Sequence, residues 1–132
     1  MEITHTTVQG ASPITVVRVS GNLDSGTAGY FNDEMKRIVD AGAANVLLDF
    51  SGVPYMSSVG IRCLSALFEW LHPFNSVDEK RSISQQIHAG KYRAPHLKLL
   101  NPNDRVVEVL HIIGLDSYLD ILDDEKTALA AF

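Results

Sequence analysis

The stretch that decides the expected fold is Leu47–Leu64, LLDFSGVPYMSSVGIRCL. Its first four residues belong to a nearly unbroken apolar run, Asn45–Phe50, which is typical of a strand buried on both faces of a sheet. Ser51-Gly52-Val53-Pro54 predicts a turn, after which Ser57-Ser58 can cap a helix that continues to about Leu71. The stretch therefore predicts a buried strand that leads through a turn into the N-terminus of a helix.

The predicted helix has three faces when its residues are spaced at about 100°. The core face holds Gly60, Ile61, Leu64, Leu67, Phe68 and Leu71, the solvent face Ser58, Arg62, Ser65 and Glu69, and the flank between them Val59, Cys63, Ala66 and Trp70. Ser58 is thus expected to be an exposed hydroxyl at the positive end of a helix, where free N–H groups and the helix dipole favour a phosphoryl group. On physical grounds alone, a plain N-cap role for Ser57 or Ser58 is the simpler interpretation.

Strands and helices are expected to alternate along the rest of the chain. The pattern predicts a hairpin of Ile3–Thr7 with Pro13–Ser20, a helix from Thr27 to Gly42 with apolar positions at Tyr30, Phe31, Met35, Ile38 and Val39, a strand at Leu97–Leu100, a helix after Asn101–Asp104 that ends at Gly114, a strand at Tyr118–Leu122 and a helix from Asp124 to Phe132. This alternation predicts one α/β domain over residues 1–132, with helices packed on a mostly parallel or mixed sheet.

The segment from Pro73 to His96 breaks the pattern. It lacks apolar periodicity and is rich in Asn, Ser, Gly and Pro, so we expect a long loop or a partly ordered insertion at about 73–96. The insertion carries four basic and two acidic side chains, whereas the whole chain has a formal net charge of −5. Loops of this length in compact domains are usually functional or disordered.

Composition argues against several classes of protein. A net charge of −5 disfavours a nucleic-acid partner, because phosphates require a basic surface. No signal peptide and no membrane-spanning run is recognisable. The single cysteine cannot form an internal disulfide, which favours a cytoplasmic location. The spacings typical of zinc sites, EF-hands and Walker loops are absent from the sequence, so we expect no metal and no cofactor.

Three segments together resemble a known family. The Asp49-Phe50-Ser51-Gly52 turn and the run Tyr55–Arg62, YMSSVGIR, resemble the signature of STAS domains, in particular of bacterial anti-sigma factor antagonists. Gly21-Asn22-Leu23-Asp24 followed by Thr27 is similar to the family's G-x-L-D-x-x-T segment. Near the end, Asn101-Pro102 and Ile113-Gly114-Leu115 resemble its third-helix region. The resemblance covers about residues 2–72 and 97–130 and implies a STAS-like mixed sheet of four to five strands with about four helices.

The resemblance implies a regulatory switch and not an enzyme. In the family, the unphosphorylated domain binds an anti-sigma factor that is also a serine kinase, which frees the sigma factor and so regulates transcription. Phosphorylation ends the binding, and a serine phosphatase reverses it. Carried over by position, the acceptor is Ser58, with Ser57 as the alternative because it stands where the family often has Asp. The implied partner-binding residues are Asp24, Ser57, Ser58, Val59 and Arg62.

Two further functions are considered for the chain. A STAS domain could bind another protein, or sense a ligand, without any phosphorylation, and the basic insertion would then be its contact surface. A hydrolase with Ser58 as nucleophile is disfavoured, since no histidine lies within a helical turn of Ser58 along the sequence.

Four residues have open roles. Asp24 could contact the partner, or it could cap the helix that begins near Thr27. Val59 and Trp70 could be exposed anchors for a partner, or the insertion could cover them. Cys63 is expected to be a small packed residue on the helix flank.

Overall fold

The computed structural model describes residues 1–71, 77–89 and 93–132. The strands are β1 (Glu2–Gln9), β2 (Pro13–Ser20), β3 (Val46–Gly52), β4 (Leu97–Leu100) and β5 (Asp120–Leu122), and the helices are α1 (Ala28–Asp40), α2 (Ser58–Leu71), α3 (Val77–His88), α4 (Asp104–Ile113), a 3₁₀ turn η1 (Leu115–Ser117) and α5 (Glu125–Ala130). The strands form one sheet in the order β1-β2-β3-β4-β5. Among the strands of the described residues, only β1 runs antiparallel to its neighbour, which confirms the predicted mixed α/β fold.

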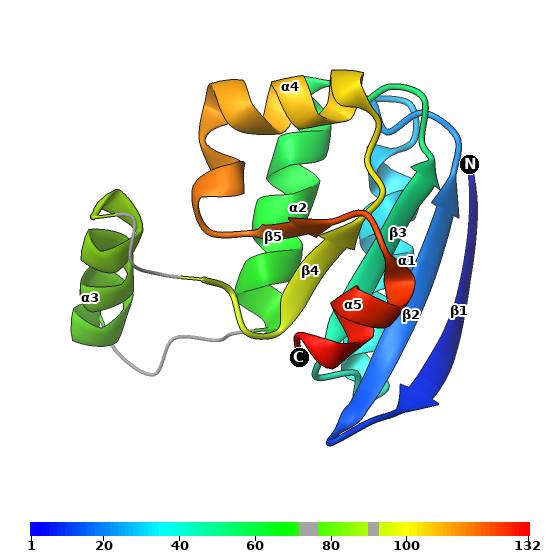
Figure 1. Cartoon of the computed structure of the whole chain (residues 1–132). Helices are drawn as coiled ribbons and strands as arrows, with labels where there is room; N and C mark the ends of the chain where they lie inside the picture. The colour runs from blue at the N-terminus through cyan, green and yellow to red at the C-terminus, as the bar shows by residue number, and fades with distance from the viewer. Residues whose placement is uncertain (72–76, 90–92) are drawn as a thin grey trace.

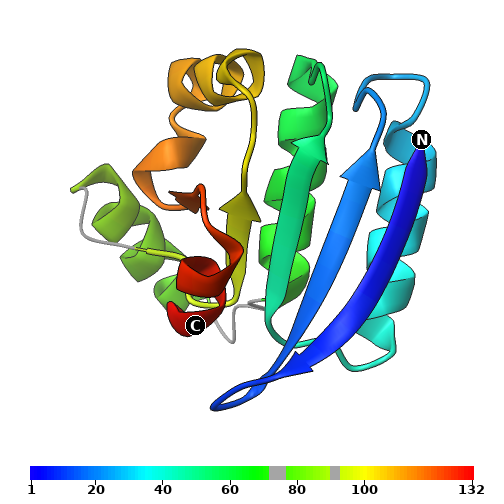
Figure 2. The same ribbon diagram turned by 45° about the vertical axis from the view of Figure 1, so that its right-hand side comes forward.

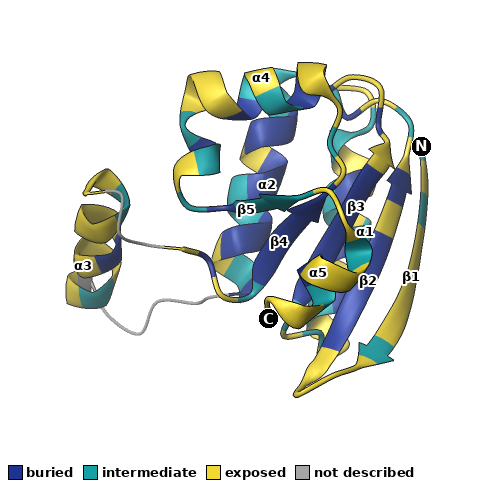
Figure 3. Cartoon of the chain, viewed as in Figure 1, coloured by how far each residue is buried: buried dark blue, intermediate teal, exposed yellow. Residues whose placement is uncertain are grey.

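The helices cover the two faces of the sheet unequally. Helices α1 and α2 lie on one face, α5 lies on the other, and α4 crosses near the carboxyl ends of β3 and β4 (Figure 1, Figure 2). The first five residues of β3 are buried, as expected for a central strand with both faces covered (Figure 3). Val46, Leu48 and Phe50 belong to the larger core beneath α1 and α2, whereas Leu47 packs with Ala128 of α5 in a smaller core.

The helix that follows β3 begins and ends where the sequence predicts. Its residues Gly60, Ile61, Leu64, Leu67, Phe68 and Leu71 are all buried. Gly42 and Gly114 follow α1 and α4 with φ angles of 112° and 85°, the left-handed conformation that glycine adopts readily at the end of a helix. One expectation is wrong within α1. Tyr30 was assigned to its apolar face but is 48% exposed.

The expected loop at 73–96 contains a helix instead. Helix α3 spans Val77–His88 and has Asp78 and Glu79 in its first turn and His88 in its last, which complements the helix dipole. Ile83 is buried, and Ile87, one turn later, is partly buried. The three apolar residues of this sequence, Val77, Ile83 and Ile87, did not produce a recognisable period, so the helix was missed. The rest of the expected insertion includes residues 73–76 and 90–92, which lie outside the described residues.

Helix α1 lies against the flank of α2 at Trp70. Lys36 of α1 places its Nζ atom 5.4 Å from the centre of the Trp70 ring, and Trp70 is partly buried against the core. Cys63 is only 2% exposed, so it is a packed residue, as expected, but it lies in the core. Burial raises the pKa of its thiol, although a hydrogen bond with Asn32 opposes this shift. Trp70 is therefore an α1 contact and not a free anchor.

No helix in the described part of the chain is both long enough and apolar enough to cross a membrane.

Candidate functional site at the N-terminus of α2

Three loops meet at the carboxyl edge of the sheet, where β2, β3 and β4 end. The β2–α1 and β3–α2 loops are paired through an isolated parallel β-bridge between Leu23 and Met56. The Leu23 N–H donates to the Tyr55 carbonyl at 3.0 Å, and the Ser57 N–H donates to the Leu23 carbonyl at 3.0 Å. The β4–α4 loop is attached by the Asn103 amide, which donates to the Pro54 carbonyl at 3.0 Å. The start of α2 is thus fixed on both sides.

Asp49 holds the turn that leads from β3 toward α2. Its Oδ1 accepts hydrogen bonds from the Ser51 N–H at 3.0 Å and the Ser51 hydroxyl at 2.7 Å, and its Oδ2 accepts one from Arg18 Nη1 at 2.6 Å. Burial opposes ionisation, but these hydrogen bonds from Ser51 and Arg18 outweigh it and hold the pKa of Asp49 below its usual value. Hydrogen bonds of the Asp-Phe-Ser-Gly sequence therefore fix the turn that precedes the site.

Gly60 allows α2 to approach the β2–α1 loop closely. A Cβ atom at this position would lie 2.3 Å from Met56 Cγ and 3.1 Å from Leu23 Cγ. Both neighbouring side chains are at most 1% exposed, so neither can move aside into solvent. A side chain at residue 60 would push the first turn of α2, and Ser58 with it, away from the loop.

The two serines have different roles. Ser57 is the N-cap, because its Oγ accepts a hydrogen bond from the Val59 N–H at 3.2 Å, and it is partly buried. Ser58 is the first residue of α2 and is exposed, and its hydroxyl has no hydrogen-bond partner among the described residues. The first turn of α2 contains no acidic side chain, so the positive end of its dipole is not already neutralised. The free hydroxyl therefore lies at an end of α2 that favours an anion.

Asp24 stabilises its own loop and does not cap α1 directly. Its Oδ1 accepts a hydrogen bond from the Gly26 N–H at 2.9 Å. Thr27, the N-cap residue of α1, makes no side-chain cap hydrogen bond, and its hydroxyl donates to the Asn22 carbonyl at 2.7 Å. The Leu23–Met56 bridge brings this loop beside the loop that carries Ser58. Asp24 is partly exposed there.

Val59 and Arg62 complete the surface predicted from the sequence. Val59 is partly exposed, and Arg62 is exposed one helical turn after Ser58, on the same side of α2. The prediction missed Tyr55, which is 44% exposed in the loop next to the serines. An aromatic residue that follows Pro54 in a surface loop was the available signal, since exposed tyrosines are common anchors at interfaces.

Two of the described histidines are hydrogen-bonded to groups other than Ser58. His96 Nδ1 lies 2.9 Å from Asn45 Oδ1 before β4, and His111 Nδ1 lies 2.8 Å from Asp116 Oδ2. None of the described histidines forms a hydrogen bond with Ser58 that could activate it as a nucleophile.

Comparison with known proteins identifies the family. The family model of the STAS domain matches residues 5–72, more than half of the chain. The chain belongs to the STAS domain family. Among curated proteins, no match to the chain was found.

Solved structures share the fold of this STAS domain over nearly its whole length. An anti-sigma factor antagonist from Mycobacterium paratuberculosis has a TM-score of 0.71 at 22% identity, covering 98% of this chain and 93% of its own. A putative anti-sigma factor antagonist from Thermotoga maritima has a TM-score of 0.73 at 16% identity, with coverages of 97% and 92%. The Bacillus cell fate determinant SpoIIAA, solved in its phosphorylated form, has a TM-score of 0.58 at 16% identity, with coverages of 96% and 97%.

Proposed function

We propose that this STAS domain is a cytoplasmic anti-sigma factor antagonist that is switched off by phosphorylation of Ser58. Its partner is an anti-sigma factor with serine kinase activity, bound when Ser58 carries no phosphate, and a serine phosphatase restores the binding form. The protein itself catalyses no reaction. The observation that carries the proposal is the free, exposed Ser58 hydroxyl at the first residue of α2, held beside the Asp24 loop. The anti-sigma factor antagonists among its structural neighbours, one of them solved in a phosphorylated form, support it.

The geometry favours Ser58 over Ser57 as the acceptor. A kinase needs an exposed hydroxyl that is free to approach the γ-phosphate of ATP. Ser57 does not offer one, because its hydroxyl oxygen caps α2. A phosphate on Ser58 would add about −1.5 to −2 charges at the positive end of the helix dipole, where the fold tolerates them. Arg62, one turn further on, could pair with that phosphate.

Phosphorylation would act on the partner and not on the fold. The surface made by Asp24, Ser57, Ser58, Val59 and Arg62 is small and nearly uncharged overall around the serines. A docked protein would have to bury the phosphate, whose charge of about −1.5 to −2 exceeds what Arg62 alone can neutralise, and burying the remaining charge costs several kcal/mol. We therefore expect phosphorylation to weaken binding about a hundredfold or more.

The test incubates the domain with an anti-sigma factor of the serine kinase type from the same organism and ATP, and follows phosphate transfer by intact mass. Ser58→Ala should bind the partner and accept no phosphate, while the matched variant Ser57→Ala should still be phosphorylated. Ser58→Asp should fold but bind the partner weakly. Its effect on binding should be smaller than that of phosphorylation, because Asp carries less negative charge than a phosphate. Tyr55→Ala should weaken binding without changing phosphate transfer to the free domain, if the exposed ring is an anchor.

Two results would contradict the proposal. If Ser57→Ala, and not Ser58→Ala, loses phosphorylation, the acceptor is wrong by one position. If neither serine accepts phosphate while the partner still binds, the domain is a binding module without a phosphorylation switch.

A further inference from the structure

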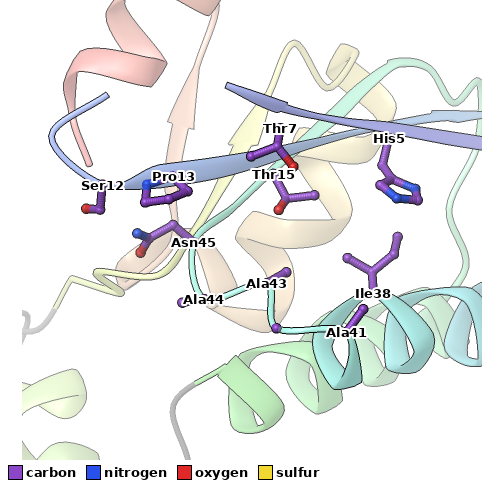
Figure 4. Close-up of a pocket in the computed structure, with 11 residues that line it drawn as sticks. His5, Thr7, Ser12, Pro13, Thr15, Ile38, Ala41, Ala43, Ala44 and Asn45 are labelled. Atoms are coloured by element: carbon purple, nitrogen blue, oxygen red, sulfur yellow. The ribbon is translucent and has the colours of Figure 1, made fainter. Parts of the chain in front are cut away.

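A pocket lies at the end of the molecule opposite Ser58, between the β1–β2 hairpin and the end of α1 (Figure 4). Its volume is about 440 Å³, within the range of small-molecule sites. In Figure 4, His5 from β1 and Ile38 from α1 point toward one another across the opening. Ile38 and the short side chains of Ala41, Ala43 and Ala44 give the pocket an apolar wall.

Neutral hydrogen-bonding groups line the other side. Thr7 and Ser12 contribute hydroxyls from the hairpin. Thr15 is only 8% exposed, and its hydroxyl lines the pocket with no hydrogen-bond partner among the described residues. The Asn45 amide has a fixed orientation, because its Oδ1 lies 2.9 Å from His96 Nδ1. The Thr15 hydroxyl can therefore form a hydrogen bond with a molecule bound in the pocket.

The lining indicates which chemistry the pocket would accept. The described residues that form it include no carboxylate, lysine or arginine, so apart from His5 at the opening they offer a charged ligand no opposite charge. The carboxyl end of α1, at Ala41 and Gly42, is the negative end of its dipole. Three carbonyls of its last turn already accept one hydrogen bond each, from the N–H groups of Ala41, Gly42 and Ala43, but a carbonyl oxygen has two lone pairs and can accept a second bond. An anion would be repelled there, whereas N–H or O–H groups of a ligand would be favoured.

We propose that this pocket binds an uncharged small molecule that packs an apolar ring or chain against Ile38 and the alanines and directs N–H or O–H groups to Thr15 and the end of α1. The site is separate from the phosphorylation surface and does not depend on the proposed function. Helix α1 begins beside the Asp24 loop and ends at the pocket, so it is the structural element common to both.

The test compares isosteric probes that differ in charge. Benzamide and phenol are neutral donors with an apolar ring, and benzoate is the matched anion. Each is titrated at millimolar concentration into the full chain, and the backbone amide signals are followed by NMR. Benzamide and phenol should shift the amides of Thr15, Ala43 and Asn45 with dissociation constants near or above about 1 mM, as for fragments. Benzoate should leave these signals in place.

Variants decide whether the shifts come from the pocket. Thr15→Val keeps the shape but removes the hydroxyl, and it should weaken benzamide binding about three- to tenfold. Ala41→Leu should fill the pocket and abolish binding. The matched control is Thr6→Val, because Thr6 pairs with Val16 and faces the other side of the sheet, and it should change nothing. The proposal is overturned if the neutral probes cause no shift, if benzoate binds equally well, or if Thr15→Val and Ala41→Leu bind like the parent chain.

Discussion

Asp49 connects the sheet to the loop that carries Ser58, and its protonation should be visible in the stability of the fold. Its pKa is lowered in the folded state, so its contribution to stability is complete above the unfolded pKa of about 3.9 and is lost as the pH falls through the folded pKa. We expect the free energy of unfolding to decrease as the pH is lowered below about 4.

The Asp49→Asn variant tests this source of acid sensitivity. At pH 7 it should lower the free energy of unfolding by about 1–2 kcal/mol, because it removes charge-assisted hydrogen bonds from a half-exposed arginine. Its stability should also depend less on pH between about 2 and 4. Urea unfolding across this pH range measures both effects. Asp33→Asn, at an exposed position on α1, is the control, and equal acid sensitivity in Asp49→Asn and the parent chain would contradict the assignment.

Ser57 and Ser58 could not be told apart by sequence, since either can be an N-cap at the start of a helix. The structure separates them through the direction of one hydroxyl, which bonds to the Val59 N–H. Ser57→Ala should therefore cost about 1 kcal/mol of stability, whereas Ser58→Ala should change it by less than about 0.5 kcal/mol. Urea unfolding of the two variants checks this, and equal losses would mean that Ser58 also caps α2.

How well a helix or strand could be predicted from the sequence depends on how many apolar residues it buries. Helix α2 was predicted closely because it buries a full apolar face. Strand β3, expected at Asn45–Phe50 and found at Val46–Gly52, was recognised because both of its faces are covered. Helix α3 buries Ile83 and was missed. The position of Trp70 was also unpredictable, because it depends on α1 packing along the flank of α2 and not on the period of α2 itself.

The packing of α2 on the Leu23 loop can be tested through two helical glycines. Gly60→Ala places a methyl group against Met56 and Leu23 and should cost about 1–3 kcal/mol. Gly29→Ala lies in the first turn of α1, where a Cβ atom meets nothing within 4 Å, and it should stabilise the fold by about 0.5–1 kcal/mol. Thermal or urea unfolding measures both. If both variants were stabilised, the close approach at Gly60 would be wrong.

For the whole molecule, the question is whether α3 belongs to the cooperative fold. Ile83 and Ile87 line a pocket together with Ser65, Phe68 and Glu69 of α2 and with Tyr118, and the ring centroids of Phe68 and Tyr118 are 5.2 Å apart. Lys80 Nζ approaches Glu69 Oε1 at 3.8 Å. This side of α2 begins about two turns beyond Ser58, and Phe68 is the member of the main core that faces the pocket.

Replacing residues 75–91 with a short Gly/Ser linker should therefore leave a folded domain with a single cooperative transition. The loss of Ile83 burial should cost about 1.5–3 kcal/mol, and the shortened linker should offset little of it, because loop-closure entropy changes slowly with length. Ile83→Ala in the full chain should account for part of this loss. Phosphorylation of Ser58 and partner binding should be retained, since the start of α2 is held by Leu23 and Asn103. An insoluble or molten product would place α3 in the core, and retained folding with lost partner binding would place the interface on α3.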